Sequence, residues 1–198
     1  MPLIGRQLGF RYGNGPWIFR NVDIDLHAGE TVGLFGPSGC GKTTVARILA
    51  GYDTPAEGSV TLDGAPLPAK GVHPVQLVFQ HPEKAVNPRH RMRRILSESW
   101  MPDRGMLDLF GISGDWLDRW PNELSGGELQ RFCILRALAP STRFIIADEI
   151  TAMLDAVTQA QIWHALMNVA SERKLGLLVI SHDRALLERL CGRIIEWG

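Results

Sequence analysis

The fold is decided by one stretch of the sequence, Thr31-Val32-Gly33-Leu34-Phe35-Gly36-Pro37-Ser38-Gly39-Cys40-Gly41-Lys42-Thr43. Its first five residues form a short apolar run, which predicts a buried strand. Its last eight match the pattern G-x-x-x-x-G-K-[ST], and residues 43–50 then fit a helix that stops at Gly51. Composition alone would produce the four fixed positions by chance with a probability of roughly 0.4%. The order of strand, loop and helix therefore predicts a phosphate-binding loop.

The residue types in this loop suit a nucleoside triphosphate. Glycines allow backbone N–H groups to turn inward around phosphate oxygens, and the start of the following helix adds partial positive charge. Lys42 can reach the β- and γ-phosphates, and the Thr43 hydroxyl can ligate Mg²⁺. We therefore expect ATP and Mg²⁺ to be held by the loop and the helix start, Gly36, Pro37, Ser38, Gly39, Cys40, Gly41, Lys42, Thr43 and Thr44.

Cys40 lies inside the loop and allows two interpretations. Thiols at helix N-termini are often reactive, so Cys40 could act as a redox switch. Alternatively, its small side chain only fills the loop. The three cysteines, Cys40, Cys133 and Cys191, show no CxxC or Cys/His ligand spacing, which is typical of reduced thiols in a cytosolic protein.

Further apolar runs predict strands at residues 75–79, 144–147, 177–180 and 194–195, and helical patterns lie at 156–170 and 184–190. Strands that alternate with helices imply an α/β fold with a mostly parallel sheet covered on both faces. In such sheets, ligand sites gather beyond the carboxyl ends of the strands. Polar or glycine residues follow the runs at these ends: Gly36, Gln80, Asp148, Glu149 and His182. This placement predicts a single site at one edge of the sheet.

Two adjacent acids follow the run at 144–147. A carboxylate at Asp148 can hold Mg²⁺ through its water shell, and a carboxylate at Glu149 can polarise an attacking water. An acidic pair after an apolar run can also mark only the boundary between a strand and a turn. The phosphate-binding loop in the same chain favours the functional interpretation.

The remaining segments suggest two additions to the sheet. Residues 3–12 and 17–26 look like strands joined by a turn at 13–16, and 59–64 suggests a further hairpin. Residues 81–139 are rich in arginine, proline and helical patches, with little strand signal, and so predict a helical insertion.

Composition excludes some classes of partner. The 198 residues carry 21 basic and 21 acidic side chains, so the formal net charge is zero. A balanced charge provides no global field for a polyphosphate chain, and we expect no nucleic-acid partner. The chain has no visible secretory signal and no apolar run of the ~18–20 residues that span a bilayer.

The segment Leu124-Ser125-Gly126-Gly127-Glu128-Leu129-Gln130-Arg131 marks a second helix start. Ser125 with Glu128 three residues later is a capping-box pattern, which an ordinary helix start explains. The two glycines also permit a close approach of the backbone to a second phosphate group. Two anion-binding helix starts require either one large site or two chains that share a ligand.

These motifs together resemble the ATPase subunits of ABC transporters, and the segment 124–131 resembles their signature sequence. The order of phosphate loop, Gln80, signature, Asp148-Glu149 and His182 is similar over nearly the whole chain. The resemblance implies the P-loop NTPase (RecA-like) fold, with an antiparallel β subdomain and an inserted helical subdomain. It implies a single ABC ATPase domain over residues 1–198, with a core at 1–80 and 140–198 and a helical subdomain at about 81–139.

The resemblance also implies a head-to-tail dimer around two ATP molecules, with either a second copy or a related subunit as the partner. Ser125, Gly126 and Gly127 of one chain would then face the γ-phosphate bound by the other chain. Asp155 would line the interface between the two chains. Tyr12 would stack on adenine, although its alternative is an ordinary strand residue.

By the same resemblance, four residues would perform the hydrolysis. Lys42 would bind the phosphates, Gln80 would sense Mg²⁺ and the attacking water, and Glu149 would be the general base. His182 would contact the γ-phosphate. Ile150, Ala152 and Leu135 depart from the residues common in the family, but none of these changes removes a catalytic group.

The family's partner is an integral membrane permease, so we expect a cytoplasmic protein that lies peripherally on the inner face of the cell membrane. Residues 81–104 would face the permease, and Arg89, Arg91, Arg93 and Arg94 either dock there or form a solvated basic face. The stretch 78–89 resembles the dipeptide, oligopeptide and nickel importer branch, whose members usually extend further beyond the histidine. The alternative is a soluble ABC-type ATPase that acts on nucleic acid or ribosomes.

Overall fold

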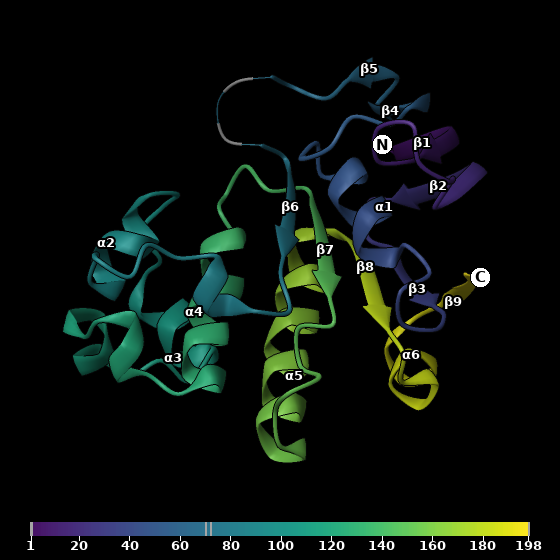
Figure 1. The fold of residues 1–198 in the computed structure, drawn as a ribbon. Coiled ribbons are helices and arrows are strands. Elements are labelled where there is room, and N and C mark those ends of the chain that lie inside the picture. Colours follow the sequence, from purple (N-terminus) through teal and green to yellow (C-terminus); the bar gives the residue numbers. More distant parts are fainter. Residues whose placement is uncertain (1, 70, 72, 198) are drawn as a thin grey trace.

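A computed structural model describes residues 2–69, 71 and 73–197 of the chain. Two sheets lie on one side of the molecule and a helical segment lies on the other (Figure 1). Within these residues, the structure contains no helix of sufficient length and apolarity to cross a membrane.

The central sheet consists of β3 (Thr31–Phe35), β6 (Val75–Val78), β7 (Phe144–Asp148), β8 (Gly176–Ser181) and β9 (Arg193–Glu196). The strands lie in the order β6-β7-β8-β3-β9, and every pair is parallel. Phe35 pairs with Ser181, and Asp148 pairs with Ile180. Because the strands are parallel and in this register, their carboxyl ends meet at one edge, as the sequence predicts.

Alternate residues of the central strands point to opposite faces of the sheet, and both faces are buried. Ile145 and Ala147 of β7 belong to one apolar core, together with residues of α4 (Gly126–Ala137) and α5 (Ala156–Arg173). Phe144 and Ile146 belong to a second core with α1 (Lys42–Leu49). This period of two on a strand buried on both sides explains the continuous apolar run in the sequence.

The second sheet is antiparallel and lies against α1 (Figure 1). It consists of β1 (Pro2–Phe10), β2 (Phe19–His27), β4 (Glu57–Leu62) and β5 (Ala65–Pro66), in the order β2-β1-β4-β5. The sequence predicts the first two strands at 3–12 and 17–26, and these inner boundaries are wrong. Residues 11–18 form a loop instead, which the bond from the Ile18 N–H to the Phe10 carbonyl closes at 2.9 Å.

The chain between β6 and β7 is helical, as expected. It contains η1 (Pro82–Lys84), α2 (Met92–Ser97), α3 (Arg104–Leu109), η2 (Gly114–Asp118), η3 (Pro121–Glu123) and α4. Buried side chains from several of these helices, such as Ile95, Phe110 and Phe132, join the core on the α5 face of the sheet. The helical segment is therefore anchored to the central sheet through α4. The last helix of the chain is α6 (Arg184–Leu190), between β8 and β9.

Candidate functional site

The phosphate-binding loop connects β3 to α1 and depends on two glycines. Gly39 has φ 83° and Gly41 has φ 99°, values in the left-handed region that glycine adopts without strain. A Cβ on Gly41 would lie 2.7 Å from Cγ2 of Ile18, and one on Gly36 would lie 2.1 Å from the Trp197 carbonyl oxygen. The loop is therefore shaped both by its own backbone and by residues distant in the sequence.

Lys42 is bonded to the loop that precedes it. Its ammonium donates to the carbonyl oxygens of Gly36 and Pro37, each at 2.7 Å, and its side chain is buried. The positive charge is thus held at the mouth of the loop, where it can pair with a phosphate.

Asp148 lies directly behind the loop, at the end of β7. Asp148 is 4% exposed, and burial raises the pKa of its carboxyl group. A hydrogen bond from Thr43 lowers the pKa, the charge of Glu149 raises it, and that of Lys42 lowers it. The loop and the acidic strand end are therefore electrostatically coupled.

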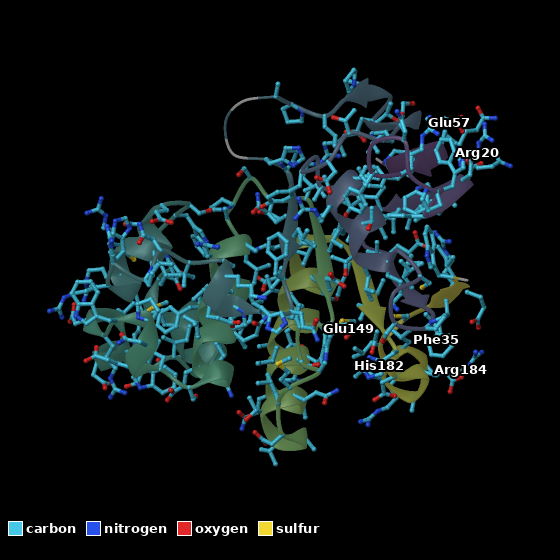
Figure 2. The ribbon with its side chains drawn as sticks, viewed as in Figure 1. Arg20, Phe35, Glu57, Glu149, His182 and Arg184 are labelled. Atoms are coloured by element: carbon cyan, nitrogen blue, oxygen red, sulfur yellow. The ribbon has the colours of Figure 1, made fainter. Side chains whose placement is uncertain are left out.

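Glu149 contacts two other residues that the sequence predicts for the site. His182 Nδ1 lies 3.2 Å from one carboxylate oxygen, and Gln80 Nε2 donates to the other at 3.4 Å. The Glu149 backbone is left-handed, with φ 50°, and its N–H donates to the Ile180 carbonyl at 3.0 Å. This conformation turns the carboxylate beyond the end of the sheet, where Figure 2 shows it beside His182. The structure thus brings together three residues that lie far apart in the sequence.

The loop and Glu149 line one open pocket of about 410 Å³. Tyr12 and Thr44 line it too, and the Tyr12 ring packs edge-on against Phe10 with 67% of the residue exposed. Ile18 also lines the pocket, and the sequence did not predict this. The sequence pattern places Ile18 in a strand, whereas the structure places it in the loop 11–18. The full lining is Tyr12, Ile18, Ser38, Gly39, Gly41, Lys42, Thr43, Thr44, Gln80 and Glu149.

The signature segment lines a different pocket, of about 400 Å³. Ser125 caps α4: its hydroxyl accepts from the Glu128 N–H at 3.3 Å, and its own N–H donates to the Glu128 carboxylate at 2.7 Å. This confirms the predicted capping box. Gly126, Gly127 and Asp155 also line this pocket. The two pockets share no lining residue, so the structure does not bring the signature to the phosphate loop of the same chain.

Asp155 has a structural task of its own. Its carboxylate accepts hydrogen bonds from the N–H groups of Val157 and Thr158, both at 3.0 Å, and so caps α5. A hydrogen bond from the Thr158 side chain, followed by those from the N–H groups of Thr158 and Val157, lowers the pKa of the Asp155 carboxyl. The apolar side chains of Met153 and Val157 stand exposed on either side of it. Exposed apolar groups beside a pocket are typical of a surface that meets another protein.

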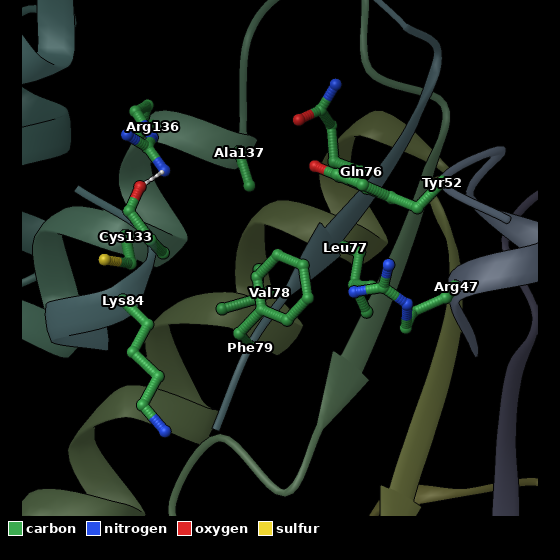
Figure 3. Close-up of a pocket in the computed structure, with 11 residues that line it drawn as sticks. Arg47, Tyr52, Gln76, Leu77, Val78, Phe79, Lys84, Cys133, Arg136 and Ala137 are labelled. Carbon is green, nitrogen blue, oxygen red and sulfur yellow. Dashed lines mark hydrogen bonds between the residues drawn. The ribbon is translucent and has the colours of Figure 1, made fainter. Parts of the chain in front are cut away.

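A third cavity, of about 330 Å³, lies between the central sheet and the helical segment (Figure 3). Its walls come from α1, β6, η1 and α4 and include Arg47, Tyr52, Phe79, Lys84 and Arg136. The Arg136 guanidinium donates to the Ala85 carbonyl at 2.7 Å and ties the two sides of the helical wall together. Cationic and aromatic side chains line this cavity, which is a groove separate from the phosphate loop.

The parallel sheet, the phosphate loop and the acidic strand end define the class of P-loop nucleotide hydrolases. Comparison with known proteins gives the family. The profile of the family described as "ABC transporter" matches residues 19–152, and the chain belongs to this family. It is an ATP-binding and ATP-hydrolysing protein of the ABC type.

Characterised relatives cover most of the chain. The chain is 38% identical to the nickel import ATP-binding protein NikE of Escherichia coli (strain K12), across 90% of this chain and 74% of the relative. It is 37% identical to NikE of Rhodospirillum rubrum, across 90% and 71%. The family resemblance and the ABC ATPase fold that the sequence suggests are therefore confirmed.

Solved structures agree on the fold. A dimeric, post-hydrolysis structure of the ATP-binding cassette MJ0796, bound to ADP and Pi, superposes with a TM-score of 0.83 at 25% identity, covering 99% of this chain and 94% of that one. The structure of cbiO1 from Clostridium perfringens, described as part of the transporter complex cbiONQ, gives a TM-score of 0.82 at 21% identity, covering 99% and 84%.

Proposed function

We propose that the chain is the motor subunit of an ABC importer, which pairs head to tail with a second ATPase subunit and drives a separate membrane permease. The observation that carries this proposal is the separation of the two half-sites. The loop pocket and the signature pocket each include the backbone of a helix start, which is suited to anions, yet they share no residue. A second subunit is needed to place a signature on the open side of the loop pocket.

Within the loop pocket, the residues divide the work. Tyr12 stacks on the adenine, and the loop amides with Lys42 bind the phosphates. Glu149 accepts the proton of the attacking water, while His182 and Gln80 hold its carboxylate in place. Thr43, Gln80 and Asp148 offer the oxygen ligands that Mg²⁺ prefers, and Mg²⁺ would neutralise charge on the phosphates.

The second subunit completes the site. Ser125, Gly126 and Gly127 of the partner contact the γ-phosphate, and Asp155 lies between the two chains. The solved relative MJ0796 is a dimer, which supports this arrangement. Binding of ATP between the subunits would close the pair, and hydrolysis would reopen it.

Two surfaces suit the permease, and their contact with it places the protein peripherally on the inner face of the membrane. The first is the groove of Figure 3, which lies between the sheet and the helical segment. The second is a cationic pocket of about 430 Å³ around α2, lined by Arg89, His90, Arg91, Arg93, Arg94, Ser97, Asp118 and Trp120. It carries four guanidinium groups and one carboxylate, so an acidic segment of the permease fits it. The NikE relatives favour nickel as the substrate, and the resemblance of the stretch 78–89 to the importer branch also allows a metal chelate or a peptide.

The shared site is tested by mixing two inactive variants. Lys42→Ala removes the phosphate ligand and Ser125→Ala removes the signature hydroxyl. In a mixed dimer, one site keeps an intact loop and an intact signature, so ATPase activity should return on mixing. Activity of the wild-type chain should also rise faster than linearly with protein concentration. A rate strictly linear in concentration, down to conditions where the chain is monomeric, would contradict the proposal.

Permease docking is tested by charge reversal in the cationic pocket. The double variant Arg89→Glu/Arg94→Glu should lose co-purification with the membrane protein that accompanies the wild type. Arg104→Glu is the matched control, because Arg104 is an exposed arginine on α3 with its own partner, Asp108, at 2.9 Å. Unchanged co-purification of the double variant would exclude this pocket as a docking surface.

A further inference from the structure

The end of β9 lies directly beside the beginning of the phosphate loop. β9 is the edge strand next to β3 (Figure 1). Phe35, the last residue of β3, pairs with Glu196. Trp197 extends this pairing by one residue, since its N–H donates to the Phe35 carbonyl at 2.7 Å. The residue that follows the strand is thus fixed at the point where the loop leaves the sheet.

The side chain of Trp197 reaches the other end of the loop. Its indole Nε1–H donates to the Cys40 carbonyl at 2.8 Å. The ring packs edge-on against Phe19, with ring centroids 5.3 Å apart, and Trp197 is only 8% exposed. One residue therefore bonds to the backbone on both sides of the segment 36–39.

The loop is also moulded closely on the backbone of Trp197. A Cβ on Gly36 would lie 2.1 Å from the Trp197 carbonyl oxygen, and the Cys40 thiol lies 3.8 Å from the same oxygen. Phe19, which supports the indole, lies 3.2 Å from the position of a Cβ on Gly41. A side chain on Gly36 or Gly41 would therefore clash with this packing.

The indole bond has a clear consequence for anion binding. A loop that turns its N–H groups toward a phosphate must turn carbonyls outward, and buried carbonyls need donors. Lys42 supplies the donor for Gly36 and Pro37, and Trp197 supplies it for Cys40. Lys42 lines the loop pocket and can turn to a phosphate, whereas Trp197 is not among the lining residues, so its indole can stay bonded to Cys40.

We propose that Trp197 is a positioning residue for nucleotide binding, whose indole N–H holds the phosphate loop in its anion-binding conformation. The proposal rests on the assignment of the loop as the ATP site. It makes a distinct statement about affinity: the indole bond favours the phosphate part of the nucleotide and leaves the adenine contact unchanged. The indole bond should contribute as much binding free energy as one neutral hydrogen bond, which corresponds to an affinity change of about two- to tenfold.

The test compares ATP with inorganic pyrophosphate by calorimetric titration of the full chain. Trp197→Phe keeps an aromatic ring against Phe19 and deletes the donor, so both ligands should bind about two- to tenfold more weakly, by the same factor. Tyr12→Ala should weaken ATP and leave pyrophosphate unchanged. Trp163→Phe, which deletes the indole hydrogen bond to the Thr151 hydroxyl at 3.0 Å on α5, is the matched control and should change neither.

A purely structural role for Trp197 gives a different pattern. If the role is only structural, Trp197→Phe would lower the melting temperature without lowering the affinity for ATP and pyrophosphate by the same factor. If Trp197→Phe binds pyrophosphate with wild-type affinity, the proposal is overturned. Replacement of Trp197 by 3-benzothienylalanine keeps the ring shape and lacks the N–H, so it repeats the test if Trp197→Phe folds poorly. If the wild type binds neither ligand, the ATP site itself is refuted. If it binds both and the variants match it, only the role of Trp197 is refuted.

Discussion

Replacement of Glu149 by glutamine separates the chemistry of this carboxylate from its structural contacts. Gln80 Nε2 lies 3.4 Å from one oxygen of Glu149, and His182 Nδ1 lies 3.2 Å from the other. An amide of the same length can turn its oxygen to Gln80 and its NH₂ group to an unprotonated Nδ1. Both contacts survive, so we expect the free energy of unfolding to change by less than about 1 kcal/mol. Glutamate and glutamine carry the same Cβ and Cγ, so the left-handed backbone at residue 149 should suit both equally.

The loss of basicity should be much larger than this structural effect. An amide does not accept a proton from water, and a general base contributes about 10²–10⁴-fold to a rate, or about 3–5 kcal/mol of activation free energy. We expect kcat with saturating ATP and Mg²⁺ to fall at least about 100-fold, while calorimetry shows ATP binding retained.

Size-exclusion chromatography with ATP should then show Glu149→Gln trapped as a dimer, because hydrolysis no longer reopens it. Glu172→Gln, at an exposed position on α5, is the matched control and should behave as the wild type. Turnover of Glu149→Gln close to that of the wild type would refute the assignment of Glu149 as the base.

Three further perturbations follow from the same site. Burial raises the pKa of Asp148, so its carboxylate destabilises the fold as the pH rises from the usual carboxyl range through the raised pKa, and this loss is present at neutral pH. Asp148→Asn should therefore raise the melting temperature without ligand and, because it removes a proposed Mg²⁺ ligand, raise the Mg²⁺ concentration needed for half-maximal ATPase activity; a lower melting temperature would contradict this. Gly41→Ala places a Cβ 2.7 Å from a side-chain carbon of Ile18, at a residue with φ 99°. It should lower the free energy of unfolding by about 1–3 kcal/mol in a denaturant titration and weaken ATP binding; unchanged values of both would show that the loop tolerates the strain. Burial raises the pKa of Cys133 to about 11 and that of Cys191 to about 12, so both thiols should resist maleimide at pH 7.5, whereas Cys40 should react and be protected by ATP. Labelling is measured by mass spectrometry of the peptides, and equal labelling of all three cysteines would contradict this prediction.

Most of the fold was readable from the sequence because its signals are local. The strand at 31–35 and the loop after it are one continuous segment, and the capping box at Ser125 spans four residues. The boundaries of the first two strands were less predictable. Residues 11–18 have the composition of a strand in part, but the bond from Ile18 to Phe10 closes them into a loop.

Candidate site residues could be selected from the sequence, although their geometry could not. The rule that sites gather at the carboxyl ends of parallel strands singled out Gln80, Glu149 and His182. Their mutual hydrogen bonds depend on the strand order β6-β7-β8-β3-β9, which no local pattern encodes. The left-handed backbone of Glu149 also has no sequence signal, because glutamate rarely adopts it.

The sequence by itself determined the α/β class, the phosphate-binding loop and the polar residues that follow each apolar run, because periodicity, glycine spacing and capping act between neighbours in the chain. Only the tertiary structure decided which distant segments complete the loop and which do not. It placed Trp197 on the carbonyl of Cys40, 157 positions away, because β9 joins the sheet beside β3. It also placed Ser125 and Lys42 in separate pockets, because Ser125 caps the start of α4 in the helical segment whereas Lys42 begins α1 after β3.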